Sequence, residues 1–346
     1  MKPPIDLEKK YKTYHSLFAL AIFVLLLVAM VQGLKGGYQS FDDNFFQRQV
    51  FIQDFNRLKL ALGDRIFPTV LVNRDGWMVF LEDTNINDFQ NSTGFTKKDA
   101  DEVVEVISQC YRRAQEDGFT FLIVVAPNKE TIYPNIVPDQ IGKTSKVSRF
   151  DVLNTELLNR SLPGMLDLRG PLIRESAKRQ IYYKTDTHWN GYGAYIAYEE
   201  IIKALAQDYP VLVPYPEKFF RIKERSLRVR DMAESIGTKY IMEPLIGPSP
   251  EFINFTTFGV ESGQKGVVAF TPDKDLPSLL MLHDSFGQTL IPFLSNNFEQ
   301  AIYSNVSTAS VIYIDKDKLS YINPDIVILE IVERNLPFIA KYLEGC

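Results

Sequence analysis

The stretch FTFLIVVAPNK, residues 119–129, does most to set the expected fold of this chain. From Phe121 to Ala126 every residue is apolar, and the run ends in a Pro-Asn-Lys loop. Such a run is typical of a strand covered on both faces, as the strands of a parallel sheet are. A second run of this kind, DIVILEIVERN, occupies residues 325–335. The two stretches predict buried strands of an α/β fold.

Helices and strands are expected to alternate around these two runs. Residues 97–118 carry apolar side chains at helical spacing and stop at Gly118. Further along, the pattern predicts helices near 149–160, 170–179 and 190–207, a short strand at 164–168, a strand at 278–286 and a helix at 287–298. This alternation predicts an α/β sandwich built on a mainly parallel sheet.

The N-terminal part has the pattern of a membrane anchor. Residues 16–33, SLFALAIFVLLLVAMVQG, are uncharged and long enough for one bilayer crossing, and four lysines precede them. The positive-inside rule then predicts a cytoplasmic N-terminus at 1–15 and a body on the outer side of the membrane. A stem follows at 34–65, with an amphipathic helix at 41–63, and a domain at 66–346 opens on a hairpin at 69–81. A signal-peptide core or a buried helix is the alternative for 16–33.

Composition excludes some functions. The chain has 346 residues, of which 45% are apolar, enough for a substantial core. A formal net charge of −5 argues against a nucleic-acid-binding surface. The two cysteines, Cys110 and Cys346, provide neither zinc-ligand spacing nor a disulfide framework, so we expect no metal site and a buried thiol at Cys110.

One of only three histidines lies in the segment TDTHWNG, residues 185–191. His188 follows Asp186 by two residues and precedes an apolar helix. In an extended segment residues two apart point the same way, so Asp186 can hold the imidazole in one tautomer and stabilise its protonated form. The alternative, favoured for an isolated Asp-x-His, is a turn-capping aspartate beside a packed histidine.

A serine follows another expected strand in LLMLHDSFGQTL, residues 279–290. Ser285 lies where that strand turns into a helix, and active-site residues of open α/β sheets lie at such strand ends. A serine there exposes its hydroxyl and directs its own N–H toward an oxyanion. Plain helix capping is the alternative. Together, Ser285, His188 and Asp186 provide a nucleophile, a base and an orienting carboxylate.

Four further residues are candidates for binding an oxyanion or substrate. Asn128 and Lys129 lie in the loop after the apolar run that ends at Ala126 and are expected on the same rim as Ser285, where a side-chain amide can stabilise an oxyanion. His283 contacts a substrate or fills space beside the turn. Arg334 ends the last strand next to Glu333 and either braces the site or touches substrate.

The motifs resemble those of the alginate O-acetyltransferase family, with its SGNH-hydrolase-like domain. The resemblance covers roughly residues 40–340 and rests on TDTHWNGYGA, LHDSFG, VVAPNKETIYP (124–134), PDIVILEIVERNL (324–336) and the hairpin NRDGWMVF (73–80). It implies a three-layer α/β sandwich in which Ser285 is the nucleophile, His188 the general base and Asp186 its orienter. One departure is His283, which stands where ordinary SGNH enzymes have the glycine of Gly-Asp-Ser.

The family resemblance also implies an activity and partners. Family members transfer acyl groups, usually acetyl, onto hydroxyls of exported polysaccharides, and a membrane-bound O-acyltransferase supplies the acyl group, so no soluble cofactor is expected. The first hypothesis is therefore an O-acyltransferase anchored in the cell membrane, with its domain on the periplasmic or extracellular side. A carbohydrate esterase with the same triad and a non-catalytic polysaccharide-binding scaffold of an export complex are the alternatives. A scaffold would be expected to carry a broken triad.

Overall fold

The computed structural model describes residues 20, 23–24, 27–28, 31, 48–92, 94–220, 227–238, 240–248, 250, 255–259, 265–306 and 323–343. The chain divides into two compact units, Met1–Asp64 and Arg65–Cys346. The expected cytoplasmic segment 1–15 and most of the expected anchor 16–33 lie outside the described residues. Among those that are described, no helix combines the length and the apolar character that a bilayer crossing requires.

In the first unit, helix α2 (Arg48–Ala61) falls within the predicted stem at 34–65. The chain leaves the helix through Gly63, whose φ of 86° is in the left-handed region that favours glycine. The N-terminal part of the predicted helix at 41–63 lies outside the described residues, and the segment boundaries at 15, 33 and 65 stay predictions.

The second unit opens on the predicted hairpin. Strands β1 (Val70–Val72) and β2 (Met78–Phe80) pair antiparallel. The Asn73 side chain accepts hydrogen bonds from the backbone of Asp75 and Trp77, both at 2.9 Å, and Gly76 takes a positive φ of 82°. These local bonds are typical of an Asn-initiated turn and confirm the predicted hairpin. Helix α3 (Asp83–Gln90) follows.

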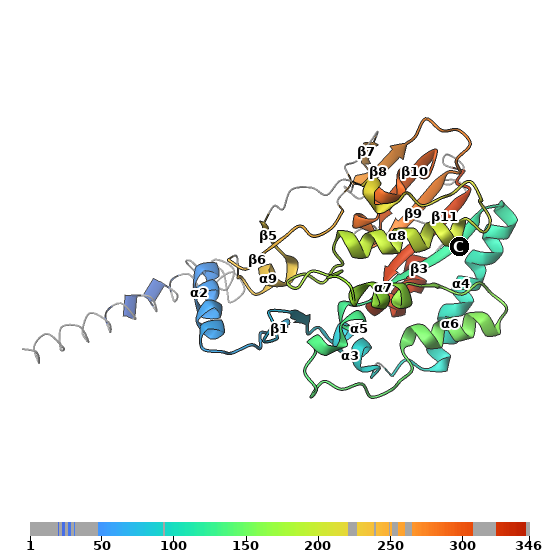
Figure 1. Ribbon diagram of the computed structural model, residues 1–346. Coiled ribbons are helices and arrows are strands. Elements are labelled where there is room, and N and C mark those ends of the chain that lie inside the picture. The colour runs from blue at the N-terminus through green and yellow to red at the C-terminus, as the bar shows by residue number, and fades with distance from the viewer. Residues whose placement is uncertain are drawn as a thin grey trace, which may run out of the picture. The chain divides into compact units, whose positions relative to one another are not determined.

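A seven-stranded sheet forms the core, in the order β4-β3-β11-β9-β10-β8-β7 (Figure 1). Its first five strands are mutually parallel: β4 (Leu166–Asp167), β3 (Thr120–Ala126), β11 (Ile326–Val332), β9 (Leu279–His283) and β10 (Gln300–Asn305). Strands β8 (Lys265–Phe270) and β7 (Phe255–Gly259) complete the sheet antiparallel at one edge. The prediction of a mainly parallel sheet is confirmed.

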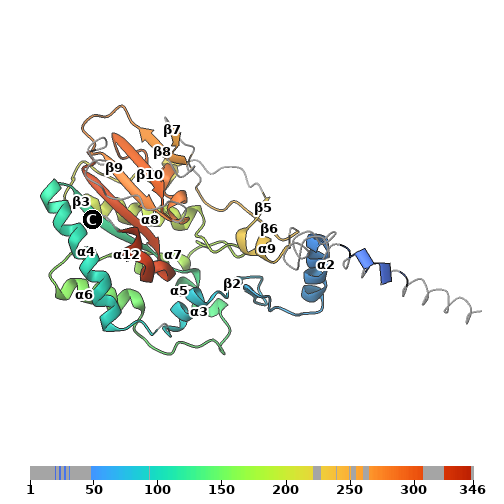
Figure 2. The same ribbon diagram turned by 180° about the vertical axis from the view of Figure 1, so that it is seen from behind.

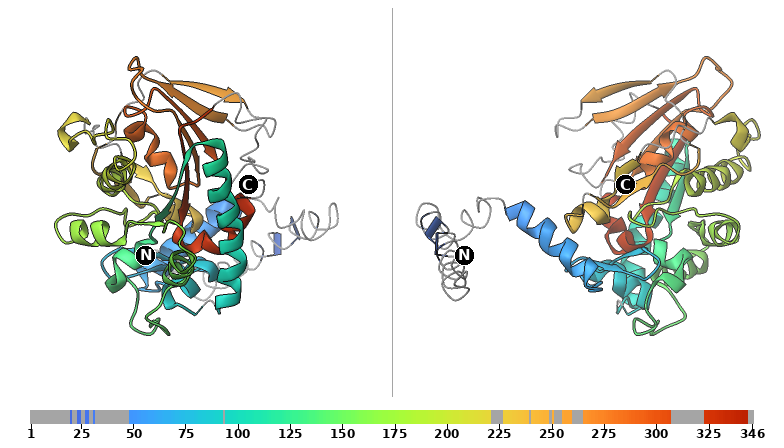
Figure 3. Two further views of the ribbon diagram at one scale, coloured as in Figure 1. Left: turned by 90° about the vertical axis from the view of Figure 1, so that its right-hand side faces the viewer. Right: turned by 60° about the vertical axis from the view of Figure 1, so that its left-hand side comes forward.

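Helices cover both faces of this sheet, so the fold has three layers (Figures 2 and 3). Successive strand residues point to opposite faces. One face packs on α8 (Gly191–Leu205) and α7 (Arg169–Ser176), and the other on α4 (Lys97–Asp117), α6 (Arg149–Asn159) and α12 (Ile339–Tyr342). Every residue of β11 is buried. Because each buried Leu or Ile stabilises the fold by roughly 1.5–3 kcal/mol, the apolar runs fix the central strands.

Local signals explain where the helices begin and end. A reciprocal capping box between Thr96 and Asp99 starts α4, and Gly118 ends it in the left-handed conformation. Asn190 caps α8 by accepting from the backbone of Tyr192 and Gly193.

Two predictions about local structure were wrong. The helix expected at 287–298 is two short pieces, the 3-10 turn η3 (Gly287–Thr289) and α10 (Ile291–Leu294), which begins beside Pro292. A proline has no N–H for a helical bond to the preceding turn, so the helix restarts there. Cys110 is buried as expected, but it is disulfide-bonded rather than a thiol. Sequence distance between cysteines does not show which of them meet in space.

Candidate active site

The site lies where three neighbouring parallel strands end. Strands β3, β11 and β9 run in register, so their carboxyl ends meet at one edge of the sheet. Asn128 and Lys129 follow β3, Asp284 and Ser285 follow β9, and Glu333 and Arg334 follow β11. Ligands of open α/β folds bind at this edge.

Ser285 projects from a tightly held turn. The carboxylate of Asp284 accepts from the backbone N–H of Phe286 (2.9 Å) and of Val332 in β11 (2.8 Å). A Cβ at Gly287 would lie 2.4 Å from that of His283, so only glycine fits at this position. Ser285 is exposed between two buried neighbours, and in the described part of the chain its N–H makes no hydrogen bond. That N–H is thus available to an incoming oxyanion.

The segment TDTHW, residues 185–189, forms a loop that approaches Ser285 from another part of the chain. This segment is called the histidine loop. His188 Nε2 lies 2.8 Å from Ser285 Oγ, and Nδ1 lies 2.6 Å from Asp186 Oδ1. The same Asp186 oxygen accepts from the His188 backbone N–H at 3.1 Å. Burial opposes ionisation of Asp186, but hydrogen bonds and charge from His188 outweigh it and lower the pKa of Asp186 below its ordinary value. The carboxylate therefore stays ionised at neutral pH.

Aromatic packing holds the two segments together. The ring of Phe286 lies 4.7 Å from that of His188 and 5.2 Å from that of Trp189, centroid to centroid. Trp189 Nε1 donates to Thr289 Oγ1 across the same contact (3.1 Å). Because the Nδ1–H of His188 donates a hydrogen bond to Asp186, the unprotonated Nε2 can accept a hydrogen bond from the Ser285 hydroxyl. The arrangement can therefore deprotonate Ser285 and hold the resulting imidazolium.

A comparison with protein families identifies this domain. The family model described as "SGNH hydrolase-like domain, acetyltransferase AlgX" matches residues 70–332. The chain belongs to this family. The predicted resemblance is thereby confirmed, and the SGNH-like fold expected from it agrees with the three-layer architecture.

Individual relatives are distant in sequence. The chain is 21% identical over 317 residues to "Probable alginate O-acetylase AlgJ" of Pseudomonas syringae pv. tomato, covering 88% of this chain and 78% of the relative. The solved structure of Bacillus cereus PatB1 with a sulfonyl adduct superposes with a TM-score of 0.58 at 14% identity, covering 77% and 97% of the two chains. The O-acetyltransferase domain of Pseudomonas putida AlgJ gives 0.51 at 16% identity, covering 78% and 93%. Both solved structures have the same fold as this chain.

Asn128 and Lys129 of this AlgX-family domain do not direct their polar groups at Ser285. Asn128 is fully buried, and its amide donates to Asp88 (2.8 Å) and accepts from Arg334 (3.1 Å). Lys129 is also buried, and Nζ donates to the carbonyl oxygens of residues 183, 184 and 186 at 3.3, 3.2 and 2.8 Å. Burial lowers the pKa of Lys129 to about 8, although nearby acids oppose this. Lys129 therefore fixes the backbone at the histidine loop and just before it through these three hydrogen bonds.

His283 and Arg334 differ in where they lie. His283 is buried with Nδ1 2.7 Å from the Asp284 carbonyl oxygen, and burial lowers its pKa, so its ring fills the space beneath the turn as a neutral group. Arg334 is half-buried, and its guanidinium carbon lies 5.6 Å from the centre of the Phe286 ring, whose neighbour is Ser285. Of the four candidates, Arg334 is the one whose side chain is not fully buried.

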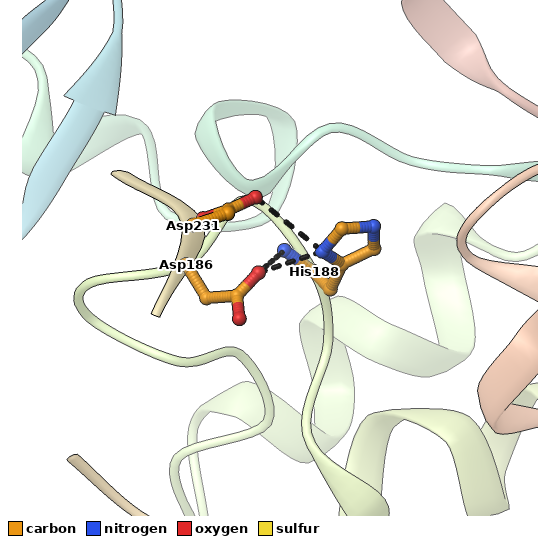
Figure 4. A group of neighbouring side chains, drawn as sticks. All are labelled: Asp186, His188 and Asp231. Carbon is orange, nitrogen blue, oxygen red and sulfur yellow. Dashed lines mark hydrogen bonds and ion pairs between the residues drawn. The ribbon is translucent and has the colours of Figure 1, made fainter. Parts of the chain in front are cut away.

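Asp231, the first residue of α9 (Asp231–Ser235), was not predicted to belong to the site. Together with Asp186 and His188 it offers ligand atoms that all lie within 4.8 Å of one another (Figure 4). Both ring nitrogens of His188 already make hydrogen bonds within the site, so a cation would have to displace one of them. No motif links Asp231 to Asp186 along the chain, and the sequence therefore gave no signal for it.

Glu330 was also missed, although a charged residue inside an apolar strand is a visible signal. It is fully buried in β11, directly opposite His283, and Oε2 accepts from the Asp284 N–H at 3.3 Å. Among the described residues, Oε1 has no partner. Burial, with the Asp284 carboxylate as the next contribution, raises the pKa of Glu330 well above 4.5. Burial therefore favours the protonated form of Glu330 beneath the serine turn.

Glu330→Gln is expected to fold normally and to gain stability over the native chain as pH rises. The folded carboxyl keeps its proton above pH 4.5, whereas the unfolded one loses it. The contribution of this carboxyl to the free energy of unfolding is therefore fully present below its ordinary pKa and is lost as pH rises toward its pKa in the folded protein. Glutamine does not titrate, so the variant lacks this dependence on pH. Urea unfolding of both proteins between pH 5 and pH 8 measures the difference, with the exposed Glu102→Gln as control. A difference that does not change with pH would contradict a neutral Glu330.

Proposed function

We propose that this protein is an extracytoplasmic O-acyltransferase that acetylates hydroxyls of an exported polysaccharide through an acyl-serine at Ser285. The observation that carries the proposal is the contact of 2.8 Å between Ser285 Oγ and His188 Nε2, in a domain of an acetyltransferase family. The relatives named alginate O-acetylases support a polysaccharide acceptor.

In the first half-reaction Ser285 Oγ attacks the carbonyl carbon of the acyl donor, and its proton passes to His188 Nε2. Negative charge then develops on the carbonyl oxygen, where the free N–H of Ser285 is proposed to donate to it. Collapse of this intermediate breaks the bond to the leaving group, which takes the proton from His188. The acyl group remains on Ser285, and Asp186 holds the imidazole throughout.

In the second half-reaction a sugar hydroxyl replaces the leaving group. His188 removes the proton of the sugar hydroxyl while the hydroxyl oxygen attacks the carbonyl carbon of the acyl-serine. Breakage of the ester to Oγ returns the proton from His188 to Ser285 and releases the acylated sugar. Arg334, over the Phe286 ring, is proposed to bind polar groups of the acceptor or donor, and Asn128 fixes its guanidinium.

We further propose that residues 16–33 anchor the chain in the cell membrane, with residues 1–15 in the cytoplasm and the domain at 66–346 outside. A membrane-bound O-acyltransferase would then supply the acyl group at the outer surface, without a soluble cofactor. The disulfide at Cys110 supports this side of the membrane, because disulfides persist in oxidising compartments outside the cytoplasm. Cleavage of the domain by a protease added to intact spheroplasts is expected, and protection until lysis would contradict this location.

Competition between sugar and water separates a transferase from an esterase. With an aryl acetate as donor, rising concentrations of an acceptor oligosaccharide are expected to increase acetylated sugar and to decrease free acetate, because both acceptors draw on one acyl-serine. Free acetate that dominates at saturating oligosaccharide would identify an esterase. A serine-directed acylating probe that fails to label the folded protein would favour the polysaccharide-binding scaffold.

A further inference from the structure

A second carboxylate lies beside the histidine loop. Asp231 Oδ2 is 3.5 Å from His188 Nδ1, the same nitrogen that bonds Asp186. Figure 4 shows both carboxylates on the Nδ1 side of the ring, with the Nε2 edge directed away from them. Between His188 and Asp231 the described part of the chain forms α8, the 3-10 turn η2 (Glu217–Phe219) and strand β5 (Leu227–Val229), so only the fold brings these two groups together.

Asp231 also holds the residue between Asp186 and His188. Its Oδ1 accepts from the Thr187 backbone N–H at 2.9 Å, and its Oδ2 accepts from the Thr187 hydroxyl at 2.5 Å. The Thr187 hydroxyl also lies 3.3 Å from His188 Nδ1, so Asp231 fixes both the backbone and the side chain of the residue that precedes the histidine. These bonds fix the backbone from which the His188 side chain projects toward Ser285.

Both carboxylates lie on the Nδ1 side of the imidazole ring. The charged groups near His188 are Asp186 on its own loop, Asp231 from α9, Lys129 below the loop and Arg334 across the Phe286 ring. Partial burial and the Asp186 carboxylate raise the pKa of Asp231, while the Thr187 bonds and His188 oppose that rise. The Asp231 side chain is 40% exposed, so water screens but does not remove its effect.

We propose that Asp231 is a positioning residue for the proposed base, which clamps Thr187 and adds a second negative charge beside His188 Nδ1. This inference rests on the proposed function, because it assigns Asp231 to the same base. When His188 takes the proton of Ser285, the positive charge forms next to two carboxylates instead of one. Asp231 thereby lowers the free energy of the protonated intermediate without touching substrate.

The test is the pH dependence of kcat/KM for Asp231→Asn. Loss of one negative charge makes the imidazole a weaker base, so the acid limb of the profile is expected to move to lower pH by roughly half a unit to one unit. The plateau of kcat is expected to fall roughly 3- to 10-fold with KM little changed. Thr187→Val removes the hydroxyl that bonds Asp231 and lies 3.3 Å from His188 Nδ1 but keeps the Asp231 charge, so it should lower kcat and move the acid limb less than Asp231→Asn does. Glu234→Gln removes an exposed charge from the same helix and is the matched control.

The outcomes separate this inference from the proposed function. Activity retained in Ser285→Ala would defeat the proposed function itself, whatever Asp231→Asn does. An inactive Ser285→Ala together with an Asp231→Asn whose acid limb matches the native profile would overturn the role of Asp231 alone, even if its rate is lower. Circular dichroism checks that each variant folds. If Asp231→Asn does not fold, Asp231→Ser, which keeps a hydrogen-bond acceptor at the start of the helix, is tested for the same shift of the acid limb.

Discussion

Ser285→Ala is expected to abolish acyl transfer while leaving the protein folded. Removing Oγ removes the atom on which the acyl group is proposed to rest, and losses of roughly 10³- to 10⁶-fold in kcat are typical when a nucleophile is deleted. Ser285 is exposed, so its truncation should change the free energy of unfolding by less than about 1 kcal/mol. The initial rate of sugar acetylation and the thermal melting curve together measure both effects.

A matched serine variant makes that result specific. Ser176 lies at the end of α7, outside both segments of the site, and its hydroxyl bonds only the Ile173 carbonyl oxygen among the described residues. Ser176→Ala should keep native activity. An active and folded Ser285→Ala would mean that the acyl group passes through another nucleophile or directly between donor and acceptor.

Asp186→Asn is expected to lower kcat roughly 10²- to 10⁴-fold with little change in KM. An asparagine amide can donate to Nδ1, which places the ring proton on Nε2, and that nitrogen then cannot accept from Ser285. The imidazolium also loses the carboxylate at 2.6 Å. Steady-state kinetics at several acceptor concentrations separate the two constants. Native kcat in a folded Asp186→Asn variant would show that Asp186 does not orient the base.

The same variant has a pH signature in stability. Because the pKa of Asp186 is lowered on folding, its ionised form stabilises the native protein above the ordinary value of 3.8, and that stability is lost as pH falls through the folded pKa. The deficit of Asp186→Asn relative to the native chain should therefore shrink toward low pH. Asp275→Asn, at an exposed loop position, provides the comparison.

The central strands and the two halves of the site were predictable because their signals are local. The apolar runs in β3 and β11 predict buried strands. The helical spacing of apolar residues predicts α4, and Gly118 marks its end. The Asp-x-His spacing and the Asp-Ser turn after β9 mark the groups that meet. The end of β9 places Ser285 at the edge where ligands of this fold class bind, whereas Asp186 and His188 lie in the loop before α8, which is not a strand end of the sheet.

Long-range features were not predictable in the same way. The direction of the Lys129 side chain depends on three carbonyl groups contributed by a distant loop, and a lysine in a loop gives no hint of this. The placement of Asp231 depends on how the chain after α8 returns to the site. The antiparallel strands β7 and β8 were missed because they pair at the edge of a sheet whose order the sequence does not state.

The most direct test of the central claim is the mass of the protein during turnover. After reaction with an aryl acetate without sugar, intact-mass and peptide measurements are expected to find one acetyl group on the peptide that contains Ser285. Added oligosaccharide should remove it as acetylated sugar appears. Acetylated sugar formed at the full rate with no acetyl group on Ser285 would contradict the account.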